Sequence, residues 1–167
     1  MSDFQPVMPD DSDDQLLEQS SPTATPDEPL QETMSVAGVA RRGDSYLMAH
    51  RAAEGDSDLA DKWEFIGGKV GNHEAPAAAL KREFLEELGV HIRVGPLFYR
   101  GSFQHKEVHF TLQAYLVDLL SENFSLEEHD HVAWVTIEQM AELDMASSDY
   151  GIFEYLLYHL DGPDDFS

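Results

Sequence analysis

Short apolar segments separated by turn residues open the patterned part of the chain. Residues 34–40 (MSVAGVA) and 46–50 (YLMAH) are mostly apolar, and Arg42, Gly43 and Asp44 between them have the composition of a turn. Residues 62–66 (KWEFI) have the composition of a shorter third strand, and two glycines follow them. The pattern predicts two strands joined by a turn, and then a short strand that stops at Gly67 and Gly68.

Residues 76–88 have the pattern of an amphipathic helix. Pro76 stands in the first turn, where a missing N–H removes no helical hydrogen bond, and Gly89 follows the last turn as a C-terminal stop. At about 100° per residue, one arc of the helical wheel is apolar and the opposite arc is acidic. The apolar arc holds Leu80, Phe84, Leu85 and Leu88, and the acidic arc holds Glu83, Glu86 and Glu87.

The second half of the chain alternates between strand and helix patterns. Residues 90–104, 108–119 and 132–137 are rich in β-branched and aromatic residues, as is typical of strands. Residues 138–143 have a short helical pattern. The order β-β-β-α-β-β-β-α predicts an α/β (α+β) fold, in which a mixed β-sheet is flanked by α-helices. The last helix is expected at residues 150–160, with Ile152, Phe153, Leu156, Leu157 and Leu160 on its apolar side.

The N-terminal segment differs from the rest of the chain in composition. Residues 1–32 contain nine acidic residues, several prolines, and neither Lys nor Arg. Such a segment buries too little apolar surface to offset the entropy of ordering, so we expect a disordered acidic tail. A partner-docking segment around Leu16 and Leu17 is the alternative. The expected folded domain covers residues 33–162, followed by a short C-terminal tail at 163–167.

The charge of the chain narrows the range of ligands. The formal net charge is −23, with 33 acidic residues against 10 Lys and Arg. Such a surface repels nucleic-acid backbones, so we expect no nucleic-acid partner, although bound divalent cations would still admit a small phosphate-bearing ligand. The absence of Cys excludes disulfides and thiolate metal sites. With no membrane-spanning apolar stretch and no basic, apolar leader, we expect no membrane partner and a cytoplasmic location.

The three carboxylates on the acidic arc of the helix point to metal chemistry. Glu83, Glu86 and Glu87 stand at i, i+3 and i+4, where like charges repel one another. Divalent cations compensate this repulsion, and Mg²⁺ (or Mn²⁺) prefers a few carboxylate oxygens together with waters and substrate phosphates. A solvated acidic face is the alternative, and the three residues alone do not decide between the two.

The surroundings of this helix carry a more specific pattern. From Gly68 the chain reads GKVGNHEAPAAALKREFLEELGV, which fills every specified place of G-x5-E-x7-R-E-U-x-E-E-x-G-U, where U is a bulky apolar residue. This segment resembles the signature of the Nudix hydrolase family. The preceding KWEFIGGK resembles the WEFPGGK segment of its MutT-like branch, with Ile66 in place of proline. The resemblance implies the Nudix fold, a divalent metal cofactor and a metal ligand in the main-chain carbonyl of Gly67.

The resemblance also implies roles for individual signature residues. Glu83 and Glu87 would be the main metal ligands, and Glu86 would be a ligand or the base that activates water. Glu74 would be an auxiliary ligand or a partner of Arg82. The guanidinium of Arg82 would orient the glutamates through its fork of N–H groups.

Residues outside the signature complete the implied site. Glu128 lies six residues before a tryptophan, as does a loop glutamate with a metal or base role in MutT-like members, although the neighbouring Glu127 is an alternative. Arg51 matches an arginine that contacts the nucleotide, and Phe65 would stack on or flank the base. Asp149 matches a residue that hydrogen-bonds a purine edge, and a helix N-cap is the alternative for it.

Histidines are the remaining candidate metal ligands. His129 and His131 flank Asp130, and His105 and His109 are four residues apart. A His-ligated Zn²⁺ site needs converging ligands at a familiar spacing, which the sequence does not show. We therefore expect ordinary surface or core histidines.

These observations predict an enzyme that acts on nucleotides. Water would attack a phosphorus of a diphosphate linkage, with a metal to neutralise charge and a carboxylate to remove the proton. A nucleoside triphosphate, such as an oxidised or otherwise non-standard dNTP, would give a nucleoside monophosphate and pyrophosphate. Ordinary dNTPs, CTP or other nucleoside diphosphate derivatives are alternatives, as are a non-catalytic nucleotide-binding regulator and a structural cation-binding protein. We expect a monomer or a homodimer.

Overall fold

The computed structural model describes residues 32–53 and 59–159 of the chain. The expected N-terminal tail up to residue 31, the expected C-terminal tail and Leu160 lie outside these residues. The strands are β1 (Glu32–Arg42), β2 (Ser45–Arg51), β3 (Trp63–Glu64), β4 (Ile66–Lys69), β5 (Ile92–His105), β6 (Val108–Leu119) and β7 (His129–Thr136). The helices are α1 (Pro76–Leu88), α2 (Ile137–Met140), the 3-10 turn η3 (Ser147–Asp149) and α3 (Tyr150–Tyr158).

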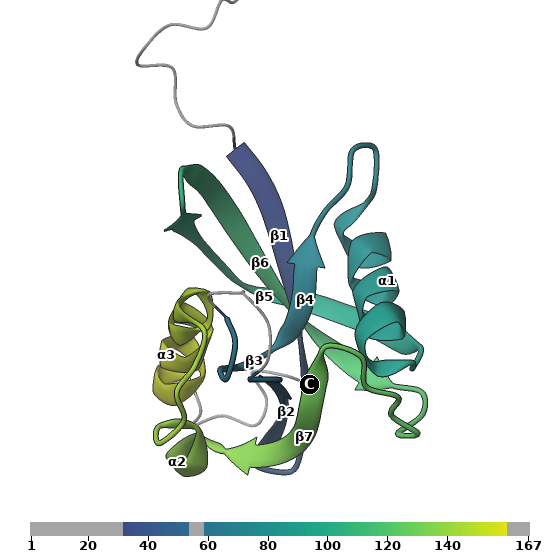
Figure 1. Ribbon diagram of the computed structural model, residues 1–167, viewed down its shortest axis with the longest axis vertical. Coiled ribbons are helices and arrows are strands. Elements are labelled where there is room, and N and C mark those ends of the chain that lie inside the picture. The colour runs from purple at the N-terminus through teal and green to yellow at the C-terminus, as the bar shows by residue number, and fades with distance from the viewer. Residues whose placement is uncertain (1–31, 54–58, 160–167) are drawn as a thin grey trace, which may run out of the picture. The chain divides into compact units, whose positions relative to one another are not determined.

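The seven strands form one mixed sheet, which confirms the predicted fold class. The main path runs β3-β2-β1-β6-β5, and the pairing of β1 with β6 is parallel, whereas the other pairings are antiparallel. The second edge of β1 is shared, because β4 pairs with residues 35–38 and β2 with residues 41–42. The sheet therefore forks along β1, with β4 on one branch and β2, β3 and β7 on the other (Figure 1).

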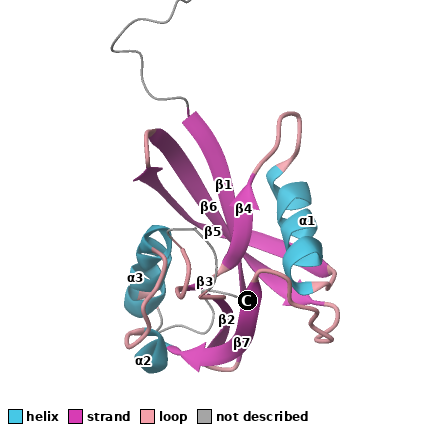
Figure 2. Ribbon diagram, in the orientation of Figure 1, coloured by secondary structure: helices cyan, strands magenta, loops and turns pink. Residues whose placement is uncertain are grey.

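Helices cover the sheet on both sides. Figure 2 shows α1 on one side of β1 and β4, and α3 on the other. Because side chains alternate along a strand, β1 and β2 supply both cores. Val36 and Leu47 pack with the apolar side of α1, while Val39 and Met48 pack with the apolar side of α3. The forked sheet thus separates two apolar clusters and leaves the acidic side of α1 free of both.

Helix α1 begins and ends where the sequence predicts. Gly89 has a φ of 71°, and its N–H donates to the carbonyl of Leu85 at 3.0 Å. Leu80, Phe84 and Leu88 are buried, as expected for the core-facing side. Leu85, which shares the apolar arc with them, is 46% exposed. It lies at the edge of the apolar arc, about 140° from Leu80 at 100° per residue.

The two glycines after the third predicted strand do not end it. Phe65 interrupts the segment, and β4 then continues through Gly67 and Gly68 to Lys69, paired with β1. A side chain at position 67 would collide with the carbonyl oxygen of Val36. The predicted stop was wrong because glycine here permits close approach of two backbones within a sheet.

The remaining helices and strands are of the predicted type, but their bounds differ from the predicted ones. β7 begins at His129 instead of residue 132, and α2 ends at Met140 instead of residue 143. In α3, Ile152 and Leu156 are buried, but Leu157 is 41% exposed and does not belong to the core. Among the described residues, no helix has both the length and the apolar character needed to cross a membrane.

Candidate active site

The three glutamates on the acidic side of α1 have different surroundings. The side chains of Glu83 and Glu87 are only 13% and 12% exposed, whereas that of Glu86 is 59% exposed. Glu83 and Glu87 are buried because this side of α1 packs against β4 and faces the start of β7. Two buried carboxylates one helical turn apart repel each other unless cations compensate them.

Arg82 supplies one compensating cation. Its Nε donates to Glu74 at 2.9 Å, one terminal nitrogen donates to the carbonyl of Lys69 at 2.9 Å, and the other donates to Glu83 at 3.0 Å. Glu74 also accepts the N–H of Gly71 at 2.7 Å, and the hydrogen bond from Arg82 lowers the pKa of Glu74. Both oxygens of Glu74 are therefore engaged, and the guanidinium holds Glu83 in one orientation.

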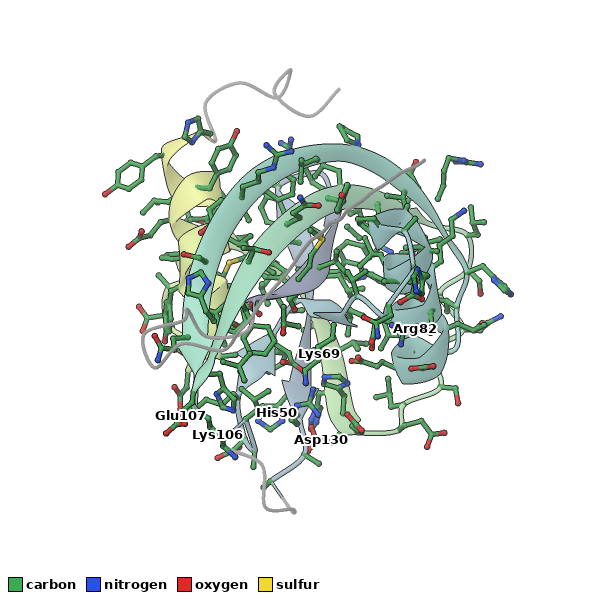
Figure 3. All side chains as sticks on the ribbon, turned by 90° about the horizontal axis from the view of Figure 1, so that it is seen from above. His50, Lys69, Arg82, Lys106, Glu107 and Asp130 are labelled. Carbon is green, nitrogen blue, oxygen red and sulfur yellow. The ribbon has the colours of Figure 1, made fainter. Side chains whose placement is uncertain are left out.

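Gly68 makes room for Glu83. A side chain at position 68 would collide with the carboxylate of Glu83, so the absence of a Cβ allows α1 to lie close to β4. Figure 3 labels Arg82 on α1 and Lys69 at the end of β4, whose carbonyl accepts a hydrogen bond from Arg82. The signature glycine and the signature glutamate are thus parts of one contact.

Glu87 lies in a second group of titratable side chains, formed with Glu64 and His129. One ring nitrogen of His129 (Nε2) lies 2.7 Å from Glu64, the other (Nδ1) lies 3.7 Å from Glu87, and the ring is fully buried. The ligand atoms of Glu64, Glu87 and His129 all lie within 4.8 Å of one another. Burial, followed by the proximity of Glu83 and Glu64, raises the pKa of Glu87 well above the usual range of a carboxyl group.

The donor set of this second group fits a divalent cation. Among the described residues, Oε1 of Glu87 and Nδ1 of His129 are buried without a hydrogen-bond partner. Buried polar atoms normally have partners, and an unmatched one indicates a missing ion or water. Carboxylate oxygens are the ligands that Mg²⁺ and Mn²⁺ prefer, and an imidazole nitrogen is compatible with Mn²⁺.

The structure brings Arg51 and Glu128 together beside this group. The guanidinium of Arg51 donates to Glu64 at 2.6 Å and to Glu128 at 2.7 Å. Glu128 is 66% exposed, and its contact with Arg51 links the start of β7 to the end of β2. Glu128 therefore contacts the arginine expected to bind the nucleotide, and Arg51 connects it to Glu64.

A cavity of about 250 Å³ adjoins these groups. Arg51, Glu64 and Phe65 line it together with Gly67 and Gly68, so it reaches the contact between β4 and Glu83. Phe103, Phe110, Leu112 and Asp149 contribute to the rest of its wall. The cavity is of a size and character that suits a small ligand with an aromatic part and a charged part.

Asp149 is a buried wall residue of this cavity. It stands at the N-cap position of α3 but makes no capping hydrogen bond with its side chain. Its carboxylate instead accepts the main-chain N–H of Phe65 at 2.8 Å, and burial raises its pKa to about 7. The N-cap alternative therefore finds no support, and Asp149 ties the loop between β3 and β4 to the last helix.

Two members of the group were absent from the sequence-based site. Glu64 belongs to the WEF segment before the signature, and its position in a predicted strand beside two glycines was the available signal. His129 was weighed as an ordinary histidine, and only its adjacency to Glu128 pointed to the site. Both become visible because β3 and β7 pair with the same strand, β2.

Comparisons with known proteins agree with this geometry. A family model for the NUDIX domain matches residues 30–156. A Mycobacterium tuberculosis protein provisionally named 8-oxo-dGTP diphosphatase 2 is 35% identical over 135 residues, which cover 76% of this chain and 89% of that protein. The CTP pyrophosphohydrolase of Escherichia coli K12 is 34% identical over 123 residues, covering 71% and 87% of the two chains. The solution structure of the E. coli ORF135 protein has a TM-score of 0.70 at 28% identity and covers 79% of this chain and 93% of that one.

The match to the family model covers the sheet, α1 and most of α3. The unbroken signature on α1, the family model and relatives above 30% identity all lead to the same assignment. The chain belongs to the Nudix hydrolase family, as a MutT-like member.

Proposed function

We propose that this enzyme hydrolyses the diphosphate linkage of a nucleoside triphosphate and releases a nucleoside monophosphate and pyrophosphate. The observation that carries the proposal is the buried pair of carboxylates, Glu83 and Glu87, beside a cavity lined by Arg51, Phe65 and Asp149. Such a pair suits a phosphate-bound cation, and such a cavity suits the nucleoside.

The cofactor of the proposal is Mg²⁺ or Mn²⁺. Glu83 and Glu87 are the residues that would hold it, with Glu64, Glu86 and the carbonyl of Gly67 as further ligands. When bound, the metal neutralises phosphate charge and acidifies or positions the attacking water. Glu74, whose two oxygens are occupied by Gly71 and Arg82, serves in this proposal as the partner of Arg82.

The residues of the chain orient the reaction and remove a proton. Arg82 fixes the carboxylate of Glu83 through a hydrogen bond of 3.0 Å. Glu86 is exposed and has only a contact of 3.4 Å with Arg82, so it is free to accept a proton from water. Glu128 is the second candidate for the base, but it would first have to leave Arg51.

The nucleoside is proposed to occupy the cavity between β4 and α3. Phe65 is buried in its wall and offers an aromatic surface near the base, while Arg51 offers a cation for phosphate or ribose. The carboxyl group of Asp149 can accept hydrogen bonds from a base edge, and it can also donate one when protonated. Two substrate classes follow from the relatives, an oxidised purine dNTP and CTP.

The remaining parts of the proposal concern the whole protein. Residues 33–162 would be the catalytic domain, and the acidic segments at 1–32 and 163–167 would be tails without a catalytic role. The net charge of −23 supports free nucleotides rather than nucleic acids as ligands. We place the enzyme in the cytoplasm, where nucleotide pools lie, as a monomer or a homodimer.

Pyrophosphate release from a nucleotide panel tests the proposal. The full chain is assayed with 8-oxo-dGTP, dGTP, CTP and dCTP, with and without Mg²⁺. We expect metal-dependent release, lowered at least about 100-fold in Glu83→Gln, which keeps the shape of the side chain but removes its charge. Glu142→Gln, on the exposed loop after α2, is the matched control and should retain full activity. No release from any of the four nucleotides would overturn the proposed substrate class.

A further inference from the structure

Another group of histidines and carboxylates lies apart from the two groups beside α1. His50 of β2 and His131 of β7 stand opposite each other in the strand pairing. Asp130 lies between them, with its Oδ1 2.7 Å from Nδ1 of His50 and 2.9 Å from Nδ1 of His131. Figure 3 shows the side chains of His50 and Asp130 next to each other. Two imidazole nitrogens and one carboxylate therefore converge from two strands.

The three ligand atoms have the spacing of a metal site. The atoms offered by His50, Asp130 and His131 all lie within 4.8 Å of one another. Directly paired residues of an antiparallel sheet hold their side chains close, so the strand register itself fixes the two imidazoles side by side. A cation that draws the three atoms inward needs only rotation of side chains, because Asp130 and His131 are 42% and 70% exposed.

The fourth residue of the group, Asp61, has the position of an orienting partner. Its carboxylate lies 2.9 Å from Nε2 of His50, on the far side of the ring from Asp130. Metal-ligating histidines usually donate their other ring N–H to a carboxylate, which fixes the tautomer and turns the free lone pair toward the metal. The ring of Trp63 lies 5.2 Å from that of His50 and shields the group on one side.

We propose that His50, Asp130 and His131 form a binding site for a transition-metal dication of the Zn²⁺ type, with Asp61 as the residue that orients His50. Imidazole nitrogens favour Zn²⁺ over Mg²⁺, and three protein ligands leave a position open for water or a further ligand. The two carboxylates together carry two negative charges, which match the charge of the cation. The site shares no residue with the Mg²⁺ ligands proposed above and does not depend on the proposed hydrolysis.

A proton is the competing occupant. The hydrogen bond to Asp130, opposed by partial burial and supported by Asp61, raises the pKa of His50. A doubly protonated His50 would satisfy the same two carboxylates without any metal. Zn²⁺ distinguishes the metal site from the protonated His50, because a bound metal would change the ring-nitrogen signals of His50 and His131 together.

Calorimetric titration with Zn²⁺ in excess Mg²⁺ tests the proposal on the full chain. Excess Mg²⁺ competes for the α1 carboxylates, and the part of Zn²⁺ binding that is lost in His131→Ala is the part that belongs to this site. We expect His131→Ala to weaken Zn²⁺ binding at this site at least about 100-fold, and Asp61→Ala to weaken it about 10- to 100-fold, as loss of an orienting carboxylate does. His91→Ala removes another exposed histidine and should leave binding unchanged. Equal binding by the native chain and His131→Ala would overturn the site.

Nuclear magnetic resonance of the imidazole nitrogens supplies the second measurement. On addition of Zn²⁺, the Nδ1 signals of His50 and His131 should shift together, while those of His91 should not. Unfolding temperatures in a chelator serve as the check that His131→Ala and Asp61→Ala are folded. If Zn²⁺ leaves the Nδ1 signals of both histidines in place, the group is an ion pair around a protonated His50 and the proposal fails.

Discussion

Two neighbouring parts of the α1 site differ in how their negative charges are compensated. On the Arg82 side, formed by Glu74, Arg82 and Glu83, one guanidinium meets both carboxylates and the carbonyl of Lys69. On the Glu87 side, formed by Glu64, Glu87 and His129, an oxygen of Glu87 and a nitrogen of His129 lie 3.7 Å apart and are buried without a hydrogen-bond partner among the described residues. Glu83 and Glu87 are only one helical turn apart, so the helix alone does not cause this difference.

This difference distinguishes the residues that position the site from the residues that gain most from binding a metal. Glu74 has both oxygens hydrogen-bonded and little capacity left for a ligand, so it holds Arg82 in place, and Arg82 in turn holds one oxygen of Glu83 and orients that side chain as a metal ligand. Buried carboxylates without compensation destabilise the fold until a cation arrives. The Arg82 side is therefore a permanent part of the structure, and the Glu87 side is where a divalent cation gains the most.

The largest expected effect comes from Glu87→Gln. The amide keeps the size of the side chain but removes the charge that a metal needs, so turnover should fall at least about 100-fold. In the presence of a chelator, the same change should stabilise the fold by about 1 kcal/mol, or about 3 °C in unfolding temperature, because burial beside Glu83 and Glu64 opposes the ionisation of Glu87, whereas an amide has no charge to bury. Pyrophosphate release and thermal unfolding measure the two effects.

Glu142→Gln is the control for Glu87→Gln, since it removes an exposed charge outside the site. A loss of turnover together with a gain in stability in Glu87→Gln would identify Glu87 as a metal ligand, because the loss of a structural residue would lower both. A Glu87→Gln protein that is folded and turns over at nearly the native rate would remove the Glu87 side from the chemistry.

The second expected effect concerns Asp149, a buried carboxyl with one main-chain partner. Asp149→Ala leaves the N–H of Phe65 without its acceptor and removes the polar group from the cavity wall, at a cost of about 1–3 kcal/mol. If Asp149 reads the base, the ratio of kcat/KM between 8-oxo-dGTP and dGTP should change by up to about 100-fold. Dependence on Mg²⁺ should persist, because the carboxylates of α1 are unchanged. An unaltered ratio would show that base selection lies elsewhere in the cavity.

A smaller effect is expected from Arg82→Lys on the other side of the contrast. An ammonium group cannot meet Glu74, Glu83 and the carbonyl of Lys69 at once, so Glu83 loses its fixed orientation. We expect kcat to fall about tenfold, since small misplacement of a catalytic group lowers the rate while binding changes little. Arg93→Lys, which alters a surface ion pair with Asp118, should have no effect. A change in KM alone would assign Arg82 to substrate binding.

Site residues that lie close together in the sequence could be predicted from it. Site residues that meet only because their strands pair could not. Pro76, Gly89 and the spacing of the glutamates fix α1 and its acidic side, because capping and periodicity are local properties. Glu64 and His129 meet only because β3 and β7 pair with opposite edges of β2, which no local pattern records. The same pairing brings His50 and His131 together.

The pair Gly67 and Gly68 was harder to predict than Gly89. In the sequence, Gly67 and Gly68 have the composition of a turn, but both lie within β4. Their role depends on what packs against them, the carbonyl of Val36 at one and the carboxylate of Glu83 at the other. Leu85 and Leu157 show the same limit on the apolar side, since a helical wheel gives the direction of a side chain but not the width of the core.

The last expected effect, on stability rather than on turnover, is a pH dependence that comes from Asp149. Burial, opposed by the N–H of Phe65 and reinforced by the charge of Glu64, raises the pKa of Asp149 to about 7. The folded state therefore binds a proton that the unfolded state has released, so the contribution of Asp149 is fully present below pH 4 and is lost as pH rises through about 7. Between about pH 5 and pH 8 this single group should lower the free energy of unfolding by about 2–3 kcal/mol. Urea unfolding of the native chain and of Asp149→Asn measures the difference, since the amide keeps an acceptor for Phe65 but has no proton to lose. The native chain should lose more stability than Asp149→Asn over this range, and other titrating groups cancel in the comparison. Parallel stability curves for the two proteins would mean that Asp149 is ionised in the folded state at pH 5, and that the N–H of Phe65 and the hydroxyl of Ser148 are then enough to hold a buried carboxylate without a cation.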